Sequence, residues 1–488
     1  MNYYLGIDIG STAVKAVLVS AGAGNRIAGR GSAAYPTRRD GLSVEQNPDD
    51  WNRAAAEAAK EACSGLDDAE KKKIAGISLS AQAGSVYAAD REYRPLTPAY
   101  TWMDRTAPGE SDMIGSAFGD RVKEMCGWGN SPAAVSAKIL MLRRTRPELF
   151  AKTAYWLTTE ESVTGFLTGN YVTDPTGQAI TRLYDVKKLS YDGQMLDFLG
   201  ITEKSLPRVL PCGSFAGRLT AGAAELIGIP EGVPVFVGAH DQYCASIGSG
   251  VTEPGQMLCA TGTAWVIFGV SDRFFDRPPY PPCCAHPASG KYGFMISMSG
   301  CGGALDAFAA SRGLTLRQID GMIEAEDPAA LREKTRDLFA TTLPPGQSIP
   351  HREGAVPPPA DAGCSPEYAA LAAMESCAFE TRILCDAFAE AGAATGTVVM
   401  SGGASKSRLW RGILAAVMSP RKLFRLCEPD APALGAALIA AVSAGEKSSL
   451  AEASADFVRT EPVIVMGDPD AAAYYEEKYQ AYRSVALA

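Results

Sequence analysis

The stretch Leu5–Thr12, LGIDIGST, decides how the chain begins. It closes an apolar run that starts at Tyr3, and it ends in Asp8-Ile9 followed by Gly, Ser and Thr. A second strand is expected over Ala13–Val19 and a third over Arg26–Ala34. Because small polar residues between two apolar runs favour a tight turn, the chain is predicted to open as strands joined at this point.

The turn has a composition that suits phosphate. Gly10 lets the backbone approach a ligand closely, while Ser11 and Thr12 supply hydroxyl and N–H groups for phosphate oxygens, and Lys15 follows. Asp8 is a candidate ligand of Mg²⁺, held through water, because Mg²⁺ takes few carboxylates and keeps its waters. The alternative is an ordinary hairpin turn with no ligand.

The same pattern restarts in the second half of the chain. An apolar strand is expected over Gln256–Ala260 and another over Ala264–Val270, with Thr261, Gly262 and Thr263 as the turn between them. The length of 488 residues fits two large domains or about three of ordinary size. We predict two domains on one plan, residues 1–247 and residues 248–488.

Asp241 is the candidate catalytic residue. It follows a buried strand expected over Gly232–Gly238, and a carboxylate at such a place can take the proton from an attacking hydroxyl. The alternative role, compatible with the first, is the N-cap of a helix expected over Gln242–Ile247. His240 is expected to pack or to form hydrogen bonds rather than to react.

A third turn, Gly402–Ser407, lies between a strand expected over Thr397–Met400 and the helix that follows. Its glycines can bring the backbone close to a nucleotide. The chain contains neither a GxxxxGK[ST] loop nor a GxGxxG fingerprint, so a P-loop or Rossmann site is disfavoured. Near the N-terminus, Trp102 to Arg105 combines an aromatic face with a charged pair, which indicates either a sugar-binding corner or a surface ion pair.

Composition excludes several other classes of function. Lys plus Arg total 46 and Asp plus Glu total 55, a net charge of −9, and no long basic run is present, which argues against nucleic-acid binding. The 12 cysteines form no CxxC pair, as expected for reduced thiols in the cytosol. Signal-peptide features and an apolar run of about 20 residues are absent. We therefore expect a soluble cytoplasmic protein.

The ordered set of motifs resembles the FGGY family of carbohydrate kinases along almost the whole chain. The segments that carry the resemblance are Leu5–Thr12, Val44–Trp51, Ser80–Gln82, Trp102–Arg105, Thr173–Thr176, Gly238–Gln242, Ser401–Trp410 and Ala433–Ala437. Each segment alone is unspecific, but their joint order is highly specific. The resemblance implies an α/β fold of two ribonuclease-H-like domains, as in actin and hexokinase, with a cleft between them.

The resemblance also implies ATP and Mg²⁺ as cofactors and a role for each matching residue. Asp241 would be the general base and Asp8 the Mg²⁺ residue. Residues on the nucleotide side would be Gly10, Ser11, Thr12, Lys15, Gly262, Thr263, Gly303, Gly402, Gly403, Ala404 and Ser407. Residues on the sugar side would be Gln82, Ala83, Trp102, Asp104, Arg105 and Gln242.

One departure affects the substrate. Family members often carry Met-His or Arg-Glu after the glutamine, whereas Ala83-Gly84 stand here, which implies a roomier or differently read pocket. We expect phosphoryl transfer to a small ketose such as xylulose. The alternatives are a kinase for a polyol or sugar acid, and a catalytically weak actin-like ATPase or sugar sensor. A homodimer is possible for such a protein.

Overall fold

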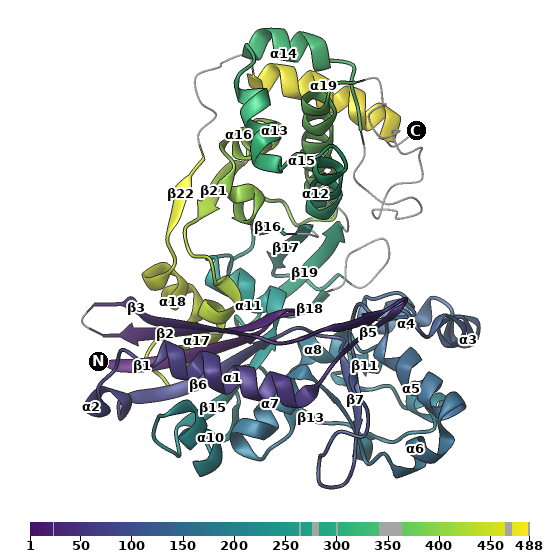
Figure 1. Cartoon of the computed structure of the whole chain (residues 1–488), viewed down its shortest axis with the longest axis vertical. Helices are drawn as coiled ribbons and strands as arrows, with labels where there is room; N and C mark the ends of the chain where they lie inside the picture. Colours follow the sequence, from purple (N-terminus) through teal and green to yellow (C-terminus); the bar gives the residue numbers. More distant parts are fainter. Residues whose placement is uncertain are drawn as a thin grey trace. The chain divides into compact units, whose positions relative to one another are not determined.

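The computed structural model describes residues 1–22, 24–262, 265–275, 283–298, 301–340, 364–463 and 471–486, so that Thr263 lies outside the described residues. The chain divides into two compact units (Figure 1). The first comprises Met1–Thr252, Pro282–Gly293 and Asp430–Val458. The second comprises Glu253–Pro281, Phe294–Pro429 and Arg459–Ala488.

The first unit is built on a six-stranded sheet with the order β14-β15-β6-β1-β2-β3. Its strands are β1 (Asn2–Ile9), β2 (Ala13–Ala21), β3 (Arg26–Ala34), β6 (Ile74–Ala81), β14 (Phe215–Arg218) and β15 (Pro234–His240). β1, β2 and β3 pair antiparallel, as the opening turn predicts, while β6 pairs parallel to both β1 and β15. Seven of the eight residues of β1 are buried, as expected for a central strand covered on both faces.

A five-stranded sheet and two short ladders complete the strands of the first unit. The sheet has the order β4-β5-β8-β7-β9. The strands of this sheet are β4 (Arg38–Asp40), β5 (Ser43–Gln46), β7 (Val86–Ala89), β8 (Ala99–Tyr100) and β9 (Tyr155–Thr158). The ladder strands are β10 (Val172–Thr173), β11 (Tyr184–Asp185), β12 (Ser190–Tyr191) and β13 (Arg208–Val209). The later segment Pro282–Gly293 of this unit contributes β18 (Cys283–Ala285).

The helices of the first unit cover the strands and carry the connections between them. They are α1 (Pro48–Ala62), α2 (Asp68–Lys71), α3 (Pro108–Phe118), α4 (Arg121–Cys126), α5 (Val135–Thr145), α6 (Pro147–Lys152), α7 (Thr159–Thr168), α8 (Pro175–Ala179), α9 (Gly193–Leu199), the 3₁₀ turn η1 (Glu203–Ser205), α10 (Ala221–Ile227), α11 (Asp241–Gly248), α17 (Ala431–Ser443) and α18 (Leu450–Phe457).

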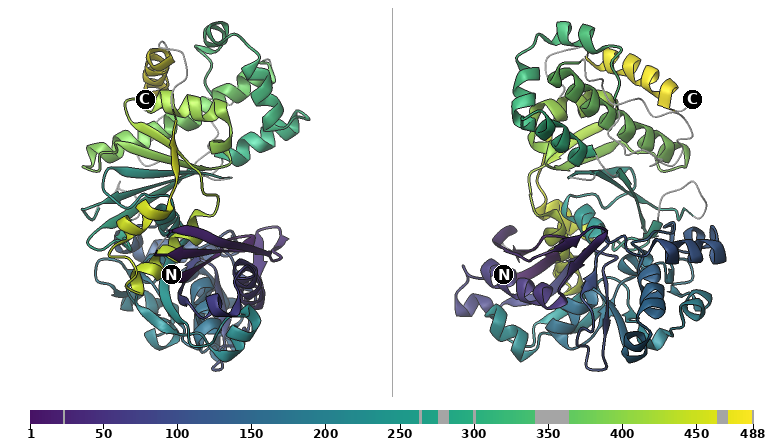
Figure 2. Two further views of the ribbon diagram at one scale, coloured as in Figure 1. Left: turned by 90° about the vertical axis from the view of Figure 1, so that its left-hand side faces the viewer. Right: turned by 45° about the vertical axis from the view of Figure 1, so that its right-hand side comes forward.

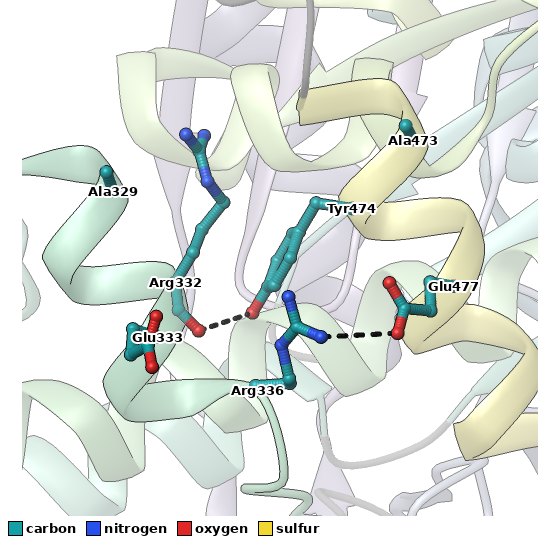
Figure 3. A pocket seen from close by; sticks show the side chains of 7 residues that line it. All are labelled: Ala329, Arg332, Glu333, Arg336, Ala473, Tyr474 and Glu477. Carbon is teal, nitrogen blue, oxygen red and sulfur yellow. Dashed lines mark hydrogen bonds and ion pairs between the residues drawn. The ribbon is translucent and has the colours of Figure 1, made fainter.

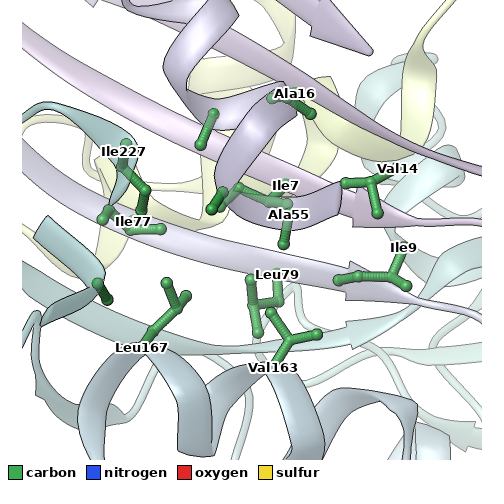
Figure 4. Packing of buried hydrophobic residues seen from close by; sticks show 14 of the residues in the cluster. Ile7, Ile9, Val14, Ala16, Ala55, Ile77, Leu79, Val163, Leu167 and Ile227 are labelled. Atoms are coloured by element: carbon green, nitrogen blue, oxygen red, sulfur yellow. The ribbon is translucent and has the colours of Figure 1, made fainter. Parts of the chain in front are cut away.

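Helix α1 forms because its local sequence specifies both its start and its buried face. The side chain of Asn47 caps the helix by accepting from the backbone N–H of Asp49 at 3.2 Å, and Pro48 occupies the first turn. Trp51 and a series of alanines turn inward. They pack with Ile7, Ile77 and other apolar residues of the sheet in one core, part of which Figure 4 shows.

Helix α17 belongs to a different unit from the one that the expected division of the chain gave it. The sequence placed all of residues 248–488 in the second domain, but Asp430–Val458 belongs to the first unit. Figure 2 shows this yellow-green segment beside the purple N-terminal strands. A Cβ added to Gly6 of β1 would lie 2.0 Å from the carbonyl oxygen of Ala433, and one added to Gly435 would lie 1.9 Å from that of Cys244. The helix therefore lies directly against β1 and α11, an approach that only glycine permits.

This close approach gives a stability prediction. Gly435→Ala should destabilise the protein by roughly 1–3 kcal/mol or more, because the methyl group overlaps the Cys244 carbonyl. Ala is intrinsically the better helix former by about 1 kcal/mol, so the expected sign is opposite to that of helix propensity. The control is Gly222→Ala in α10, where nothing lies within 4 Å of the added Cβ. A melting temperature of Gly435→Ala at or above that of the wild type would contradict the prediction.

The second unit repeats the plan of the first. Its sheet contains the order β19-β17-β16-β20-β21-β22, with strands β16 (Gln256–Thr261), β17 (Trp265–Ser271), β19 (Tyr292–Met298), β20 (Thr397–Gly402), β21 (Lys422–Leu426) and β22 (Thr460–Pro462). β16 pairs antiparallel with β17 and parallel with β20, which is itself parallel to β21. In the first unit β1 pairs in the same way with β2 and β6, and β6 with β15, so the two units share one strand plan.

The helices of the second unit are α12 (Cys301–Ser311), α13 (Leu316–Glu324), α14 (Pro328–Thr335), α15 (Pro366–Glu390), the 3₁₀ turn η2 (Ala404–Lys406), α16 (Arg408–Val417) and α19 (Ala471–Ala486). α15 carries buried acids, of which Glu375 pairs with the equally buried Lys478 of α19 at 2.5 Å. Among the helices of the described residues, none combines the length and the apolar character needed to cross a membrane.

Candidate active site

Three neighbouring parallel strands of the first unit end side by side. Ile9 of β1 and His240 of β15 both align with Ala81 of β6. The residues that follow these strand ends are Gly10, Gln82 and Asp241, and the backbone N–H of Gln82 donates to the carbonyl of Ile9 at 2.9 Å. The carboxyl ends of parallel strands are where α/β folds bind ligands, so this edge of the sheet is the candidate site.

Two carboxylates at this edge influence each other. Asp8 is buried in β1, and the hydroxyl of Ser80 donates to its Oδ1 at 2.7 Å. Burial and then the negative charge of Asp241 raise the pKa of Asp8 to about 7, against smaller opposing effects of Ser80 and Lys15. The site therefore favours a proton or a cation near Asp8.

Asp241 is the first residue of α11. His240, not Asp241, occupies the N-cap position, and no side chain caps the helix. The alternative interpretation of Asp241 as an N-cap was therefore wrong. Its side chain is 25% exposed, and Nε2 of His240 lies 3.0 Å from its Oδ1, at ion-pair distance. The carboxylate is thus partly exposed at the end of β15, where a polar ligand can reach it.

Several buried polar atoms at this edge have no hydrogen-bond partner among the described residues. They are Oε1 of Gln82, Nδ1 of His240 and Oε1 of Gln242. Buried polar atoms in proteins are normally paired, so each unpaired atom needs an explanation. A ligand rich in hydroxyl groups, which both donate and accept, would suit such atoms.

The amide of Gln46, which sequence analysis had not singled out, organises this edge. Its Oε1 accepts from Trp51 Nε1 at 3.0 Å and from Gln82 Nε2 at 2.9 Å, while its Nε2 donates to the carbonyl of Ser11 at 2.8 Å. Gln46 thereby fixes which end of the Gln82 amide is engaged, leaving Gln82 Oε1 for a ligand. The signal in the sequence that could have identified Gln46 was its position directly before the N-cap residue of α1.

The first turn leaves part of its hydroxyl-bearing residues accessible to solvent. Ser11 is half-buried, Thr12 is exposed, and the carbonyl of Gly10 accepts from the hydroxyl of Tyr35. The indole of Trp102 donates to Oγ of Ser11 at 3.1 Å. Because this oxygen accepts from Trp102, its own hydroxyl hydrogen is left to donate to a ligand.

Lys15 has a partner that the sequence did not reveal. It lies opposite Asp8 in the β1–β2 register, and its ammonium forms an ion pair with Asp430 at 3.1 Å. Arg30 pairs with the same carboxylate at 2.8 Å. The Lys15 side chain is 46% exposed, so the pair is screened by water and leaves Lys15 able to exchange partners.

The Trp102–Arg105 segment divides into exposed and buried members. Trp102 is 46% exposed and Arg105 is exposed, whereas Asp104 is 0% exposed. Both oxygens of Asp104 are occupied by protein groups, including the ammonium of Lys138. Asp104 therefore forms neither a surface ion pair nor a direct contact with a sugar in this structure, because its carboxylate is paired with the buried Lys138.

The Ala83-Gly84 step is constrained by its neighbours. Gly84 adopts φ +81°, which L side chains rarely adopt. A Cβ added there would lie 3.2 Å from Ile180 Cγ2 and 3.4 Å from Trp102 Cβ. A side chain at this position would therefore be strained by the backbone and tight against Ile180 and Trp102.

The second unit brings two of its predicted turns together. Thr261, just before Gly262, aligns with Gly402 across β16 and β20. The N–H of Gly403 donates to the carbonyl of Thr261 at 2.8 Å, and a Cβ on Gly402 would lie 2.5 Å from that oxygen. Ala404 begins η2 directly after these glycines. These turns thus form a glycine-lined strand edge like that of the first unit.

Two further residues expected on the nucleotide side lie at the starts of helices of the second unit. Ser407 caps α16, its hydroxyl accepting from the N–H of Trp410 at 3.2 Å. Gly303 lies in the first turn of α12.

A separate surface pocket of about 300 Å³ lies in the second unit between α14 and α19 (Figure 3). It is lined by Ala329, Arg332, Glu333, Arg336, Ala473, Tyr474 and Glu477. Arg336 pairs with Glu477 at 3.3 Å, and both side chains are largely exposed. Its two arginines and two glutamates balance in charge, so we assign it no substrate.

Comparisons with known proteins agree with this arrangement. The chain is 27% identical to xylulose kinase of Bacillus subtilis over 99% of its own length and 95% of the relative. It is 28% identical to gluconokinase of Bacillus licheniformis over 56% of its own length and 52% of the relative. Its fold matches a crystal structure of xylulose kinase from Rhodospirillum rubrum with a TM-score of 0.87, at 23% identity, over 99% and 98% of the two chains.

A Plasmodium falciparum glycerol kinase with ADP has a TM-score of 0.79 at 17% identity, over 100% of this chain and 99% of that one. The N-terminal domain model of the FGGY family of carbohydrate kinases matches residues 3–248, and the C-terminal domain model matches residues 301–444. Since these matches together span most of the chain, it belongs to the FGGY family of carbohydrate kinases.

Proposed function

We propose that this chain is an ATP-dependent kinase that transfers the γ-phosphoryl group to a hydroxyl of a small sugar, with a ketopentose such as xylulose as the leading substrate. One observation carries the sugar site. At the edge formed by β1, β6 and β15, buried side-chain oxygens of Gln82 and Gln242 have no partner among the described residues. Sugar hydroxyls would satisfy them.

In this proposal Asp241 is the general base. It accepts the proton of the attacking hydroxyl, while Gln82 and Gln242 orient the sugar and the exposed face of Trp102 packs on its carbon skeleton. Ala83 and Arg105 border the same sugar side, and Asp104 acts there only through the turn that it holds. Phosphoryl transfer depends mainly on positioning and charge stabilisation, because the transferring group is already activated.

The turn after β1 is proposed to receive the phosphates. Gly10 offers close backbone approach, and Oγ of Ser11 accepts from Trp102, which leaves its own hydrogen to donate to a phosphate oxygen. Thr12 is exposed beside it, and Lys15 exchanges Asp430 for a phosphate. The second unit is proposed to hold the adenosine along Gly262, Thr263, Gly402, Gly403 and Ala404, with Gly303 and Ser407 at its margins.

Asp8 fits the requirement for a divalent cation, for which we propose Mg²⁺. The raised pKa of Asp8 arises first from burial and then from Asp241, so a cation there would stabilise the ionised form. A hard cation takes oxygen ligands, and Asp8 with phosphate and water would supply them. Bound Mg²⁺ would neutralise charge on the phosphate oxygens.

The direct test is Mg-ATP-dependent ADP release across a panel of ketoses, polyols and aldonates. We expect strong stimulation by one class, ketopentoses first, and loss of that stimulation in Asp241→Asn. Stimulation by an aldonate alone would support the proposed kinase activity but replace the ketopentose by a sugar acid as the substrate. Tight ATP binding with no stimulation by any member of the panel would contradict the proposal and favour a sugar sensor.

A further inference from the structure

Lys138 is a lysine of α5 whose side chain is only 1% exposed. Its ammonium forms an ion pair with Oδ1 of Asp104, whose side chain is 0% exposed, and donates to Oγ1 of Thr106 at 3.2 Å. It also lies 6.0 Å from the ring centroid of Tyr100. Two charges removed from water in this way depend on each other for compensation.

Asp104 is the centre of a turn, Thr101–Thr106. Its Oδ2 accepts from the N–H of Val44 at 2.8 Å, which ties the turn to β5, and its Oδ1 accepts from the N–H of Thr106 at 3.0 Å. Its own N–H donates to the carbonyl of Thr101 at 2.9 Å. The carboxylate therefore fixes the backbone on both sides of itself, and Lys138 fixes the carboxylate.

The residues carried by this turn face outward. Trp102 is 46% exposed and reaches Ser11 Oγ at 3.1 Å, and Arg105 is exposed on the other side of Asp104. A shift of the turn would move Trp102 relative to the strand edge. We propose that Lys138 is a positioning residue of the sugar site, which holds the Trp102 corner through its buried ion pair with Asp104. This inference rests on the proposed sugar-kinase function.

The charge state of the pair supports a positioning role. Burial raises the pKa of Asp104, but the hydrogen bonds from Lys138, Thr106 and Val44 together bring it below its ordinary value, so the carboxylate is ionised. Replacing Lys138 by an apolar residue leaves that charge buried and unpaired, which is more disruptive than replacing both partners together. The turn is then expected to move until Asp104 reaches water.

The test compares two lysines that are equally buried. Lys138→Met should raise the KM for the sugar by about 10- to 100-fold and raise the KM for ATP much less, because misplacing a binding group by about 1 Å has effects of this size. The control, Lys478→Met, breaks the Glu375 pair of the second unit, whose side chains are each 1% exposed. It should lower the melting temperature and leave the sugar KM unchanged.

A purely structural role for Lys138 would lower the fraction of active enzyme without changing the sugar KM, and that result would overturn the proposal. If Lys138→Met does not fold, Lys138→Met with Asp104→Asn leaves no unpaired charge. This double variant should fold, but without the bond from Lys138 the turn is held less firmly, so the sugar KM should still be raised. A normal KM would equally overturn the proposal.

Amide hydrogen exchange separates this proposal from the proposed function, because it needs no substrate. In Lys138→Met, residues 101–106 should exchange faster than in the wild type, while in Lys478→Met they should not. If the wild type phosphorylates no sugar, faster exchange still supports Lys138 as the residue that holds this turn. Unchanged exchange overturns the proposal whatever the activity.

Discussion

Asp241→Asn is expected to lower kcat for sugar phosphorylation by about 10²- to 10⁴-fold, the range that a positioned general base contributes. An amide has the shape of the carboxylate but cannot accept the proton of the attacking hydroxyl. The side chain is 25% exposed and does not cap α11, so the fold should be retained. Steady-state ADP release with saturating sugar and ATP measures the effect.

The control for this variant is Asp197→Asn, at an exposed position of α9 in the same unit. It changes the net charge equally and should leave kcat within a factor of two of the wild type. ATP binding by Asp241→Asn, measured by calorimetry, should persist. A kcat within tenfold of the wild type would sink the assignment of Asp241 as the base.

Asp8→Asn is expected to stabilise the protein at pH 8 while abolishing most of its activity. The folded pKa of Asp8 is about 7 because of burial and then the charge of Asp241, against about 3.9 for an unfolded aspartate. Between these values the folded state binds more protons, so stability falls as the pH rises from about 4 to about 7. Above pH 7 the ionised Asp8 costs at most about 4 kcal/mol.

The asparagine variant removes this cost and keeps an oxygen for the hydroxyl of Ser80, which donates to Asp8 Oδ1 at 2.7 Å. The melting temperature of Asp8→Asn should therefore exceed that of the wild type by several degrees at pH 8, and the difference should shrink towards pH 5. Mg-ATP binding should weaken at both pH values. An equal or lower melting temperature at pH 8 would show that Asp8 is not destabilised as inferred.

These two variants are coupled through one repulsion. Asp241→Asn removes the negative charge that contributes to the raised pKa of Asp8. It should therefore stabilise the protein at pH 8 less than Asp8→Asn does, because the burial of Asp8 remains. The sum of the two single effects should exceed the effect of the double variant, since neighbouring charges are not additive.

Much of the fold followed from the sequence because its signals are local. The turn at Gly10 and the cap at Asn47 sit where short-range chemistry specifies them, and β3 has the predicted bounds Arg26–Ala34. The repeated strand–turn–strand pattern at Gln256–Val270 predicted a second unit on the same plan. The candidate strand-end residues Asp8, Gln82 and Asp241 were also visible, because each follows or ends an apolar run.

Other features depended on residues far apart in the chain. Lys138 lies 34 positions from Asp104, and Lys15 pairs with Asp430 across most of the chain. No periodicity in the sequence predicts such an ion pair, because tertiary packing rather than local propensity brings its two partners together. The same reason explains why α17, a helix of small residues, returned to the first unit, where Gly6 and Gly435 allow close contact.

The sequence by itself thus determined the strand order within each local motif, the turns rich in Gly and hydroxyl groups, and the family to which their order belongs. Only the tertiary structure decided which polar atoms are occupied. It turned Asp104 inward to Lys138, engaged one end of the Gln82 amide with Gln46, and left the other end unpaired. Hydrogen-bond satisfaction depends on three-dimensional neighbours, so the role of a polar side chain is settled only once those neighbours are in place.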